Sequence, residues 1–143
     1  MTTESAPSRD VLNSATRGVR CRCPHCGTGQ LFGRFLKVNN HCPECNEALY
    51  HHRADDAPPY VVITIVGHIV VGAMLIAEKA WAPDMWIHAA MWVPLTIVLS
   101  LLLLQPIKGA LIGVQWALRM HGFDPTSPEA LEMPPATAPA RSG

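Results

Sequence analysis

Two long apolar stretches restrict what this chain of 143 residues can fold into more than any other feature. They cover residues 60–77 and 85–104, and neither contains a formally charged side chain. About 20 such residues cross ~30 Å of hydrocarbon as a helix, which bonds its backbone polar groups internally. A pair of core helices in a soluble protein would need a larger surrounding core than this chain supplies. The expected elements are a transmembrane helix at 60–79, a turn at 80–84 and a second transmembrane helix at 85–105 with a kink near Pro94.

Four cysteines in two C-x2-C pairs precede the first apolar stretch, with fifteen residues between the pairs. They are Cys23, Cys26, Cys42 and Cys45. Two intervening residues let one tight turn direct both sulfurs at the same ion, so two pairs predict a tetrahedral four-thiolate metal site. Gly27 and Asn46 follow the pairs, and both residue types tolerate the positive φ that such turns often require. We expect one structural zinc ion per chain, because a closed four-thiolate site leaves no open position for a reacting water.

Other states of these thiols are open at this point. Iron also accepts four thiolates, which would make the chain a rubredoxin-like redox protein, although the short spacing favours zinc. Disulfides or free thiols are further alternatives, but five cysteines form a poor disulfide framework and bound metal implies a reducing compartment. The fifth cysteine, Cys21, is expected to be a spare thiol.

Residues 19–50 contain both cysteine pairs and are expected to form a small zinc ribbon. Between the pairs, two short apolar runs flank Gly33-Arg34, which predicts a hairpin. So small a unit depends on its metal, which contributes on the order of 10 kcal/mol to folding. Its apolar side chains form either a miniature core or a surface for lipid or a partner. They are Leu31, Phe32, Phe35 and Leu49.

The remaining segments are polar or amphipathic. We expect disordered tails at 1–18 and 122–143, a connector at 51–59, and an amphipathic interfacial helix at 106–121. Two histidines and two aspartates in the connector could form a second metal site, but carboxylates and prolines before a helix favour a helix start instead. Aromatic and basic side chains near the ends of the apolar stretches are predicted interfacial anchors. They are Trp81, Trp86, Trp116, Arg53, Lys108 and Arg119.

Three residues are candidates for helix packing or partner contact. Gly109 and Gly113 form a G-x3-G pair, which allows close approach of a second helix. His68 lies within the first apolar stretch, where we expect a hydrogen bond across helices, either within the hairpin or to a partner, rather than cofactor binding. His88 differs from it in depth by roughly 10 Å, so one haem cannot easily use both. The sequence contains no catalytic constellation, so we expect neither enzymatic activity nor a small-molecule substrate.

Basic residues indicate the orientation of the hairpin. Seven Lys or Arg residues precede the first apolar stretch, one lies between the stretches and three follow the second. The positive-inside rule therefore predicts cytoplasmic termini and a periplasmic turn, which agrees with the reduced thiols of a metal site. The N-terminus lacks an apolar segment, so no cleaved signal peptide is expected.

The formal net charge of zero gives no overall basic field, so nucleic acid is not an expected partner. Basic residues around the ribbon fit membrane headgroups better. A membrane-tethered regulatory or nucleic-acid-binding zinc ribbon remains an alternative to a structural one.

Five blocks occur in order along the chain: RCPHCGTGQLF, FLKVNNHCPECNEAL, HHRADDAPPY, VGHIVV and LLQPIKGALIGVQWALRMHGF. With them, the chain resembles the bacterial family known as domain of unknown function 983. The resemblance implies a zinc-ribbon-like region followed by two transmembrane helices, in the bacterial inner membrane. Genes of this type often lie beside those for cytochrome c oxidase subunits and assembly factors. The implied role is therefore an accessory subunit or assembly factor of a haem-copper oxidase, with membrane lipid and that respiratory complex as partners.

Overall fold

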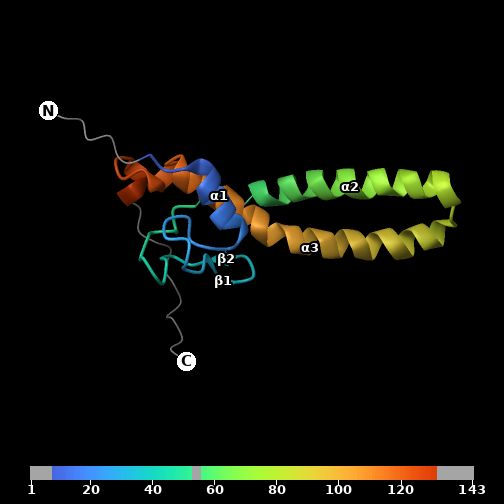
Figure 1. Cartoon of the computed structure of the whole chain (residues 1–143), viewed down its shortest axis with the longest axis horizontal. Coiled ribbons are helices and arrows are strands. Elements are labelled where there is room, and N and C mark those ends of the chain that lie inside the picture. The colour runs from blue at the N-terminus through green and yellow to red at the C-terminus, as the bar shows by residue number, and fades with distance from the viewer. Residues whose placement is uncertain (1–7, 53–55, 132–143) are drawn as a thin grey trace, which may run out of the picture.

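The computed structural model describes residues 8–52 and 56–131 of the chain. The molecule is elongated: helices α2 and α3 form an antiparallel hairpin that extends from a more compact cap (Figure 1). The cap consists of residues 8–52 and 107–131. In chain order the elements are α1 (Val11–Val19), β1 (Phe32–Arg34), β2 (Lys37–Val38), α2 (Ala57–Trp81), α3 (Met85–Ala117) and the 3-10 helices η1 (His121–Phe123) and η2 (Pro128–Leu131).

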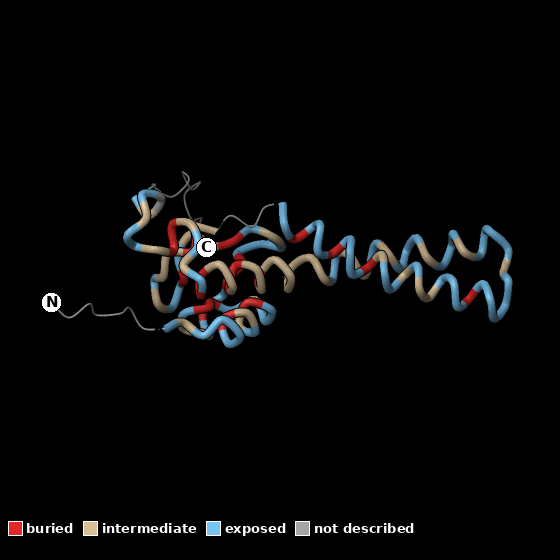
Figure 2. Tube along the Cα trace, turned by 90° about the horizontal axis from the view of Figure 1, so that it is seen from above, coloured by how far each residue is buried: buried red, intermediate tan, exposed pale blue. Residues whose placement is uncertain are grey.

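Many large apolar side chains of the α2–α3 hairpin are exposed. Figure 2 shows exposed and intermediate residues along most of the hairpin, with only scattered buried ones. Both helices are long and apolar enough to cross a membrane. In the most apolar 18-residue window of each helix, only 17% of α2 and none of α3 is buried, whereas core helices of soluble proteins are mostly buried. Ala82 adopts a left-handed conformation (φ 41°) that ends α2. These features indicate a membrane protein with two spanning helices.

Helix α3 is longer than predicted. We expected a second span ending at residue 105 and a separate interfacial helix at 106–121, but α3 runs unbroken through Pro94 and Pro106 to Ala117. Each proline removes one backbone donor from the helix. Beyond Pro106, residues 107–117 form an extension of α3 that is covered by the ribbon and α1. Packing against these partners stabilises the continuous helix, so the prediction of a separate helix at 106–121 is wrong.

Helix α1 replaces part of the predicted N-terminal disordered tail, so that prediction is wrong for residues 11–18. The Asp10 carboxylate caps the helix, accepting hydrogen bonds from the backbone N–H groups of Leu12 and Asn13 at 3.0 and 3.3 Å. So short a helix is marginal alone, and its stability comes from packing on α3. Residues 1–7 of the predicted tail lie outside the described residues.

The core of the cap is shared between the ribbon and the α3 extension. Leu31 and Leu49 are fully buried, as is Ile112 of α3. Figure 2 shows this concentration of buried residues in the cap. Of the four apolar ribbon residues considered for the core, only Phe35 is exposed. The ribbon therefore shares its core with α3 and depends on α3 for stability.

The hairpin of the ribbon is confirmed, but its turn lies later than predicted. Strand β1 pairs antiparallel with β2, with Phe32 opposite Val38. The turn occupies Phe35-Leu36 instead of Gly33-Arg34. This register buries Phe32 and Val38 together in the core. The two-stranded ribbon, the four neighbouring cysteines and the helical hairpin together confirm the expected fold class.

The connector and C-terminal segments are only partly described. Helix α2 begins at Ala57 and has Pro58 in its first turn, as expected for a helix start. Residues 53–55 lie outside the described residues, as do 132–143 of the expected disordered tail. Residues 122–131 of that tail instead contain most of η1 and all of η2, with Gly122 and Phe123 buried against the cap.

Candidate metal centre

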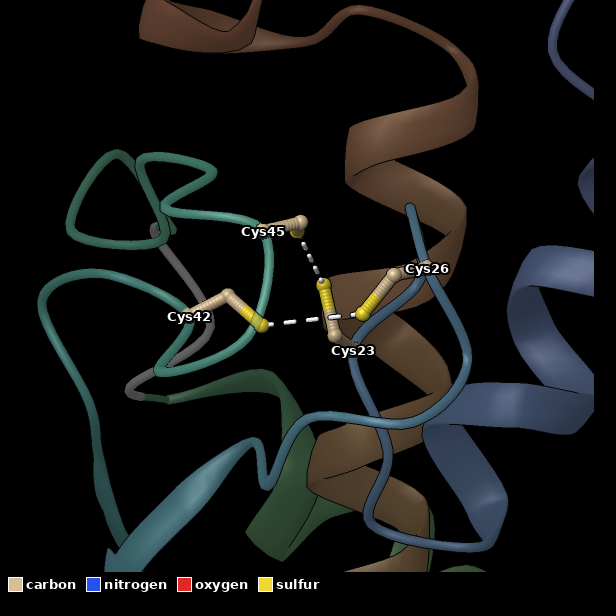
Figure 3. A group of neighbouring side chains, drawn as sticks. All are labelled: Cys23, Cys26, Cys42 and Cys45. Carbon is tan, nitrogen blue, oxygen red and sulfur yellow. Dashed lines mark hydrogen bonds between the residues drawn. The ribbon is translucent and has the colours of Figure 1, made fainter.

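The four cysteines of the two C-x2-C pairs converge from two loops that face each other in the cap (Figure 3). The Cys23 and Cys45 sulfurs are 3.8 Å apart, and those of Cys26 and Cys42 are 3.7 Å apart. A disulfide requires about 2.05 Å, so none is formed. Four sulfurs at about 2.3 Å from a central ion would be about 3.8 Å apart in a regular tetrahedron. The two cross-loop separations therefore fit a four-thiolate metal site.

The backbone of each loop turns in the way that the sequence predicted. Gly27 has φ 74° and Asn46 has φ 59°. In equivalent bonds, Gly27 N–H donates to the Cys23 carbonyl and Asn46 N–H donates to the Cys42 carbonyl, at 2.8 and 2.9 Å. These tight turns hold both sulfurs of each pair on the same side of the loop.

Burial and hydrogen bonding act differently on the individual thiols. Burial raises the pKa of Cys23 well above its usual range, and it raises that of Cys45 as well. Burial also opposes ionisation of Cys26, but donors from Thr28 and from the Gly29 N–H outweigh it and lower the pKa of Cys26 to about 5. Without metal, Cys26 is therefore the preferred thiolate. Metal binding must displace protons from other members of the cluster.

Two arginines secure the loop that contains the first pair. Arg17 of α1 donates from Nη1 to the carbonyls of Pro24 and His25, at 3.1 and 2.8 Å. Arg22 donates to the Thr28 carbonyl at 2.7 Å. These contacts connect α1 directly to the metal-binding loop, and they place positive charge near a site that gathers thiolates.

Trp116 connects the metal-binding loops to α3. Its indole Nε1 donates to the Glu47 carboxylate at 2.9 Å, and its ring lies edge-on to His25 at 5.7 Å. The Arg9 guanidinium lies over the indole ring, 4.1 Å from its centroid, and donates from Nη1 to the Trp116 carbonyl. Both cysteine loops are thus fixed to the same side chain of α3.

Cys21 is not a member of the four-sulfur cluster. It adopts a left-handed backbone conformation (φ 57°), and its carbonyl accepts a hydrogen bond from Leu31 N–H. Burial raises the pKa of its thiol, so nothing activates it as a nucleophile. The arrangement agrees with the prediction of a spare thiol.

One family model, described as protein of unknown function (DUF983), matches residues 32–116. The chain belongs to this family. The match covers the second cysteine pair, the helical hairpin of α2 and α3, and nearly all of the α3 extension. It confirms the resemblance inferred from the sequence. No curated protein and no solved structure gives a match to the chain.

In this DUF983 protein, the predicted interfacial anchors lie in different surroundings. Trp81 and Trp86 are 78% and 84% exposed at the far end of the hairpin, but Trp116 is only 6% exposed. The prediction of an interfacial role for Trp116 is wrong, because the cap encloses it. Lys108 donates to the Leu36 carbonyl of the ribbon at 3.0 Å, and Arg119 is half-buried in the cap. Arg53 lies outside the described residues.

The predicted packing residues lie in two different environments. Gly109 and Gly113 contact α1 of the cap, where added side chains would clash with the backbone of Gly18 and Ser14. His68 is exposed on α2, and its Nδ1 is 2.6 Å from the Thr64 carbonyl of the same helix. Of the two hydrogen bonds expected for His68, the one within the hairpin is not formed among the described residues, and the one to a partner stays a prediction.

Sequence reasoning missed the residues of α1 that hold the cap of this DUF983 protein together. Ser14 and Gly18 are four residues apart, which matches the spacing of Gly109 and Gly113. This second small-residue pair is the sequence signal for the close packing of α1 on α3. Asp10 is the signal for the start of α1. Arg17 had no comparable signal, because its acceptors are backbone carbonyls.

Proposed function

We propose that the chain is a membrane-anchored zinc-ribbon protein that acts as an accessory subunit or assembly factor of a cytochrome c (haem-copper) oxidase. The observation that carries the structural part of this proposal is the fixed attachment of the metal-binding loops to α3 through Trp116. A cap that is continuous with a spanning helix keeps one orientation relative to the bilayer. Such a cap is suited to docking against another membrane complex, and the closed four-thiolate site is structural rather than catalytic.

Zinc is the proposed metal. The sulfur separations suit it, and zinc sites with two C-x2-C pairs are typically structural. Iron in the same four thiolates would make the protein a redox carrier, so the identity of the metal separates two classes of function. Metal analysis of protein purified without added metal should give one zinc per chain and no visible colour. One iron per chain with thiolate-to-iron absorption would replace the structural proposal by the redox one.

The proposed location is a bacterial inner membrane, with both termini and the cap in the cytoplasm. The excess of basic residues outside the turn supports this orientation, and so does the need for reduced thiols. Reporter fusions can test it. A fluorescent protein that matures only in the cytoplasm should be active at either terminus, and a phosphatase active only in the periplasm should report from residues 82–84.

The oxidase partnership is supported by the genes that often neighbour members of this family, and it needs a direct test. Tagged protein should co-purify with oxidase subunits from native membranes, and deletion of its gene should reduce oxidase activity. A second tagged protein with two spans controls for capture of the complex in mixed micelles. Absence of oxidase subunits from the purified material, with unchanged oxidase activity in the deletion strain, would refute the partnership.

A further inference from the structure

The level at which the two spanning helices leave the hydrocarbon layer follows from one contact between them. Glu78 of α2 and His88 of α3 are level with each other, because the Glu78 carboxylate and the His88 Nε2 lie 2.8 Å apart. Eighteen residues back along α2 and eighteen forward along α3 stand Tyr60 and Pro106, about 27 Å away. A hydrocarbon layer is ~30 Å thick, so Tyr60 and Pro106 mark the surface of the bilayer on the side of the cap.

The turn between β1 and β2 lies at this surface. Lys108 is two residues past Pro106, about 3 Å along the axis of α3, and its Nζ donates to the Leu36 carbonyl of the turn at 3.0 Å. Side chains of a helix lean toward its N-terminus, which for α3 is the direction of the hydrocarbon layer. The lysine therefore holds the turn close to the bilayer. In Figure 1, β1 and β2 lie at the end of the cap from which the helical hairpin extends.

The C-terminal end of α1 reaches the same level. Gly18 contacts Gly109, which is three residues past Pro106, and α1 runs antiparallel to the α3 extension. Continuing along α1 from Gly18 therefore leads toward the bilayer. The next two residues in that direction are Val19 and Arg20, and both are exposed. Two segments that are distant in the sequence thus meet the bilayer surface side by side.

The exposed side chains of these two segments form what we call the bilayer-facing rim of the cap. They are Val19, Arg20, Arg34, Phe35 and Lys37. The two apolar members, Val19 and Phe35, are about half exposed, and each is followed or preceded by an exposed arginine. None of the three basic side chains forms a hydrogen bond or ion pair within the part of the chain that the structure describes.

The charge around the rim has one sign. The sequence contains no Asp or Glu between Asp10 and Glu44, but it contains five Lys or Arg residues there, three of which belong to the rim. Lys108 adds another positive charge at the same level. The rim therefore presents apolar groups and unpaired positive charge together, which is the combination that suits a partner with acyl chains and phosphates.

The position of the rim identifies its partner. The rim lies at the level of the lipid headgroups, next to the exposed surface of the spanning helices, so lipid is in place to cover it. Aromatic rings favour that level, and lysine and arginine attract anionic lipids there. We propose that Arg20, Arg34 and Lys37 bind the phosphates of anionic phospholipids while Phe35 inserts between their acyl chains. This proposal depends on the two spanning helices and not on the oxidase partnership, so failed co-purification would leave it standing.

Fluorine NMR of the full-length protein in lipid nanodiscs tests the insertion, because fluorophenylalanine labels only three positions of this chain. The lipid carries a nitroxide near the glycerol end of one acyl chain. The Phe35 signal, assigned as the one that Phe35→Leu removes, should lose most of its intensity. Phe123 is the internal control, since it is buried beyond Ala117, which lies about 16 Å past Pro106 along α3. Equal intensity losses at Phe35 and Phe123 would overturn the insertion and leave the rim to a protein partner.

The same signal tests the phosphate contacts when the nitroxide is carried in turn by phosphatidylglycerol and by phosphatidylcholine, each at a low share of the lipid. Phosphatidylglycerol should broaden the Phe35 signal at least about fivefold more, which is the attraction expected from a single basic side chain at the surface. Replacing both Arg34 and Lys37 by Gln should abolish this preference without changing the metal content. Lys37→Gln should lower it, whereas the matched control Lys79→Gln, at the other end of α2, should not. Equal broadening by the two lipids in the wild-type protein would overturn the phosphate contacts.

Discussion

Gly18 and Gly109 meet backbone to backbone where α1 crosses the extension of α3. A Cβ on either residue would clash with the carbonyl of the other. One turn further, Ser14 of α1 makes the same close approach to Gly113. The pairing runs in opposite directions along the two helices, so four small residues form one antiparallel crossing. The G-x3-G pair of this chain thus packs its own N-terminal helix, outside the span.

The first prediction concerns this crossing. Gly109→Leu should detach α1 and destabilise the cap by at least about 1–3 kcal/mol, because a side chain there must displace backbone. The loss of stability can be measured by heating the protein and following, at each temperature, limited proteolysis between residues 8 and 52. Gly72→Leu is the matched control, since its side chain would enter open space on α2. Equal protease resistance of the two variants would contradict the crossing.

The second prediction concerns the metal ligands. Cys42→Ser should abolish stoichiometric metal binding and unfold the ribbon, because metal binding contributes on the order of 10 kcal/mol to such folds. The hairpin should still insert, since exposed apolar side chains drive its insertion. Cys21→Ser is the control and should keep the full metal content. A Cys42→Ser protein with one tightly bound metal and a protease-resistant ribbon would refute the four-cysteine site.

The third prediction concerns Trp116. Trp116→Ala should destabilise the cap by about 3–5 kcal/mol, because it removes a buried indole from the core and leaves Glu47 without its donor. Trp86→Ala should change the unfolding free energy of the cap by less than about 0.5 kcal/mol, because Trp86 is 84% exposed and lies at the opposite end of α3 from Trp116. The temperature at which each variant releases its metal reports the unfolding of the cap and provides the comparison. Similar temperatures would mean that Trp116 is not a core residue.

The fourth prediction concerns the pH dependence of the metal-free thiols. With its pKa lowered to about 5 from 9.0, folded Cys26 is a thiolate between pH 5 and 9, where an ordinary thiol stays mostly protonated. This ionisation stabilises the metal-free fold. The contribution is complete above pH 9, decreases as the pH falls from 9 toward 5, and is lost below pH 5. Cys26 should therefore react with iodoacetamide before Cys23 at pH 7, as mass spectrometry of the peptides can measure.

Thr28→Val tests the cause of the low pKa, because it removes the hydroxyl donor to the Cys26 sulfur while keeping the shape of the side chain. The pH midpoint of Cys26 alkylation should rise in this variant. A Ser127→Ala variant removes a hydroxyl elsewhere in the cap and should leave the midpoint unchanged. An unchanged midpoint in Thr28→Val would mean that the hydroxyl does not stabilise the thiolate.

Local chemistry in the sequence was enough to identify the metal site and the spanning helices. The C-x2-C spacing and the residues after it, Gly27 and Asn46, act within single tight turns, so nearby residues decide the geometry. The two apolar stretches are similarly decisive, because hydrocarbon permits few backbone structures. The exposure of His68 was not predictable, because the packing of the two helices decides which side of α2 faces α3.

The sequence by itself therefore determined a four-thiolate ribbon attached to a helical hairpin, through short-range turn geometry and the solvent requirements of the backbone. Only the tertiary structure decided that these parts share one core. The crossing of Gly18 with Gly109, and the contacts of Trp116 with both cysteine loops, join segments 69 to 91 residues apart. Neither α1 nor the α3 extension carries a local signal strong enough to fix its position. Each becomes ordered because the other supplies the surface that it buries.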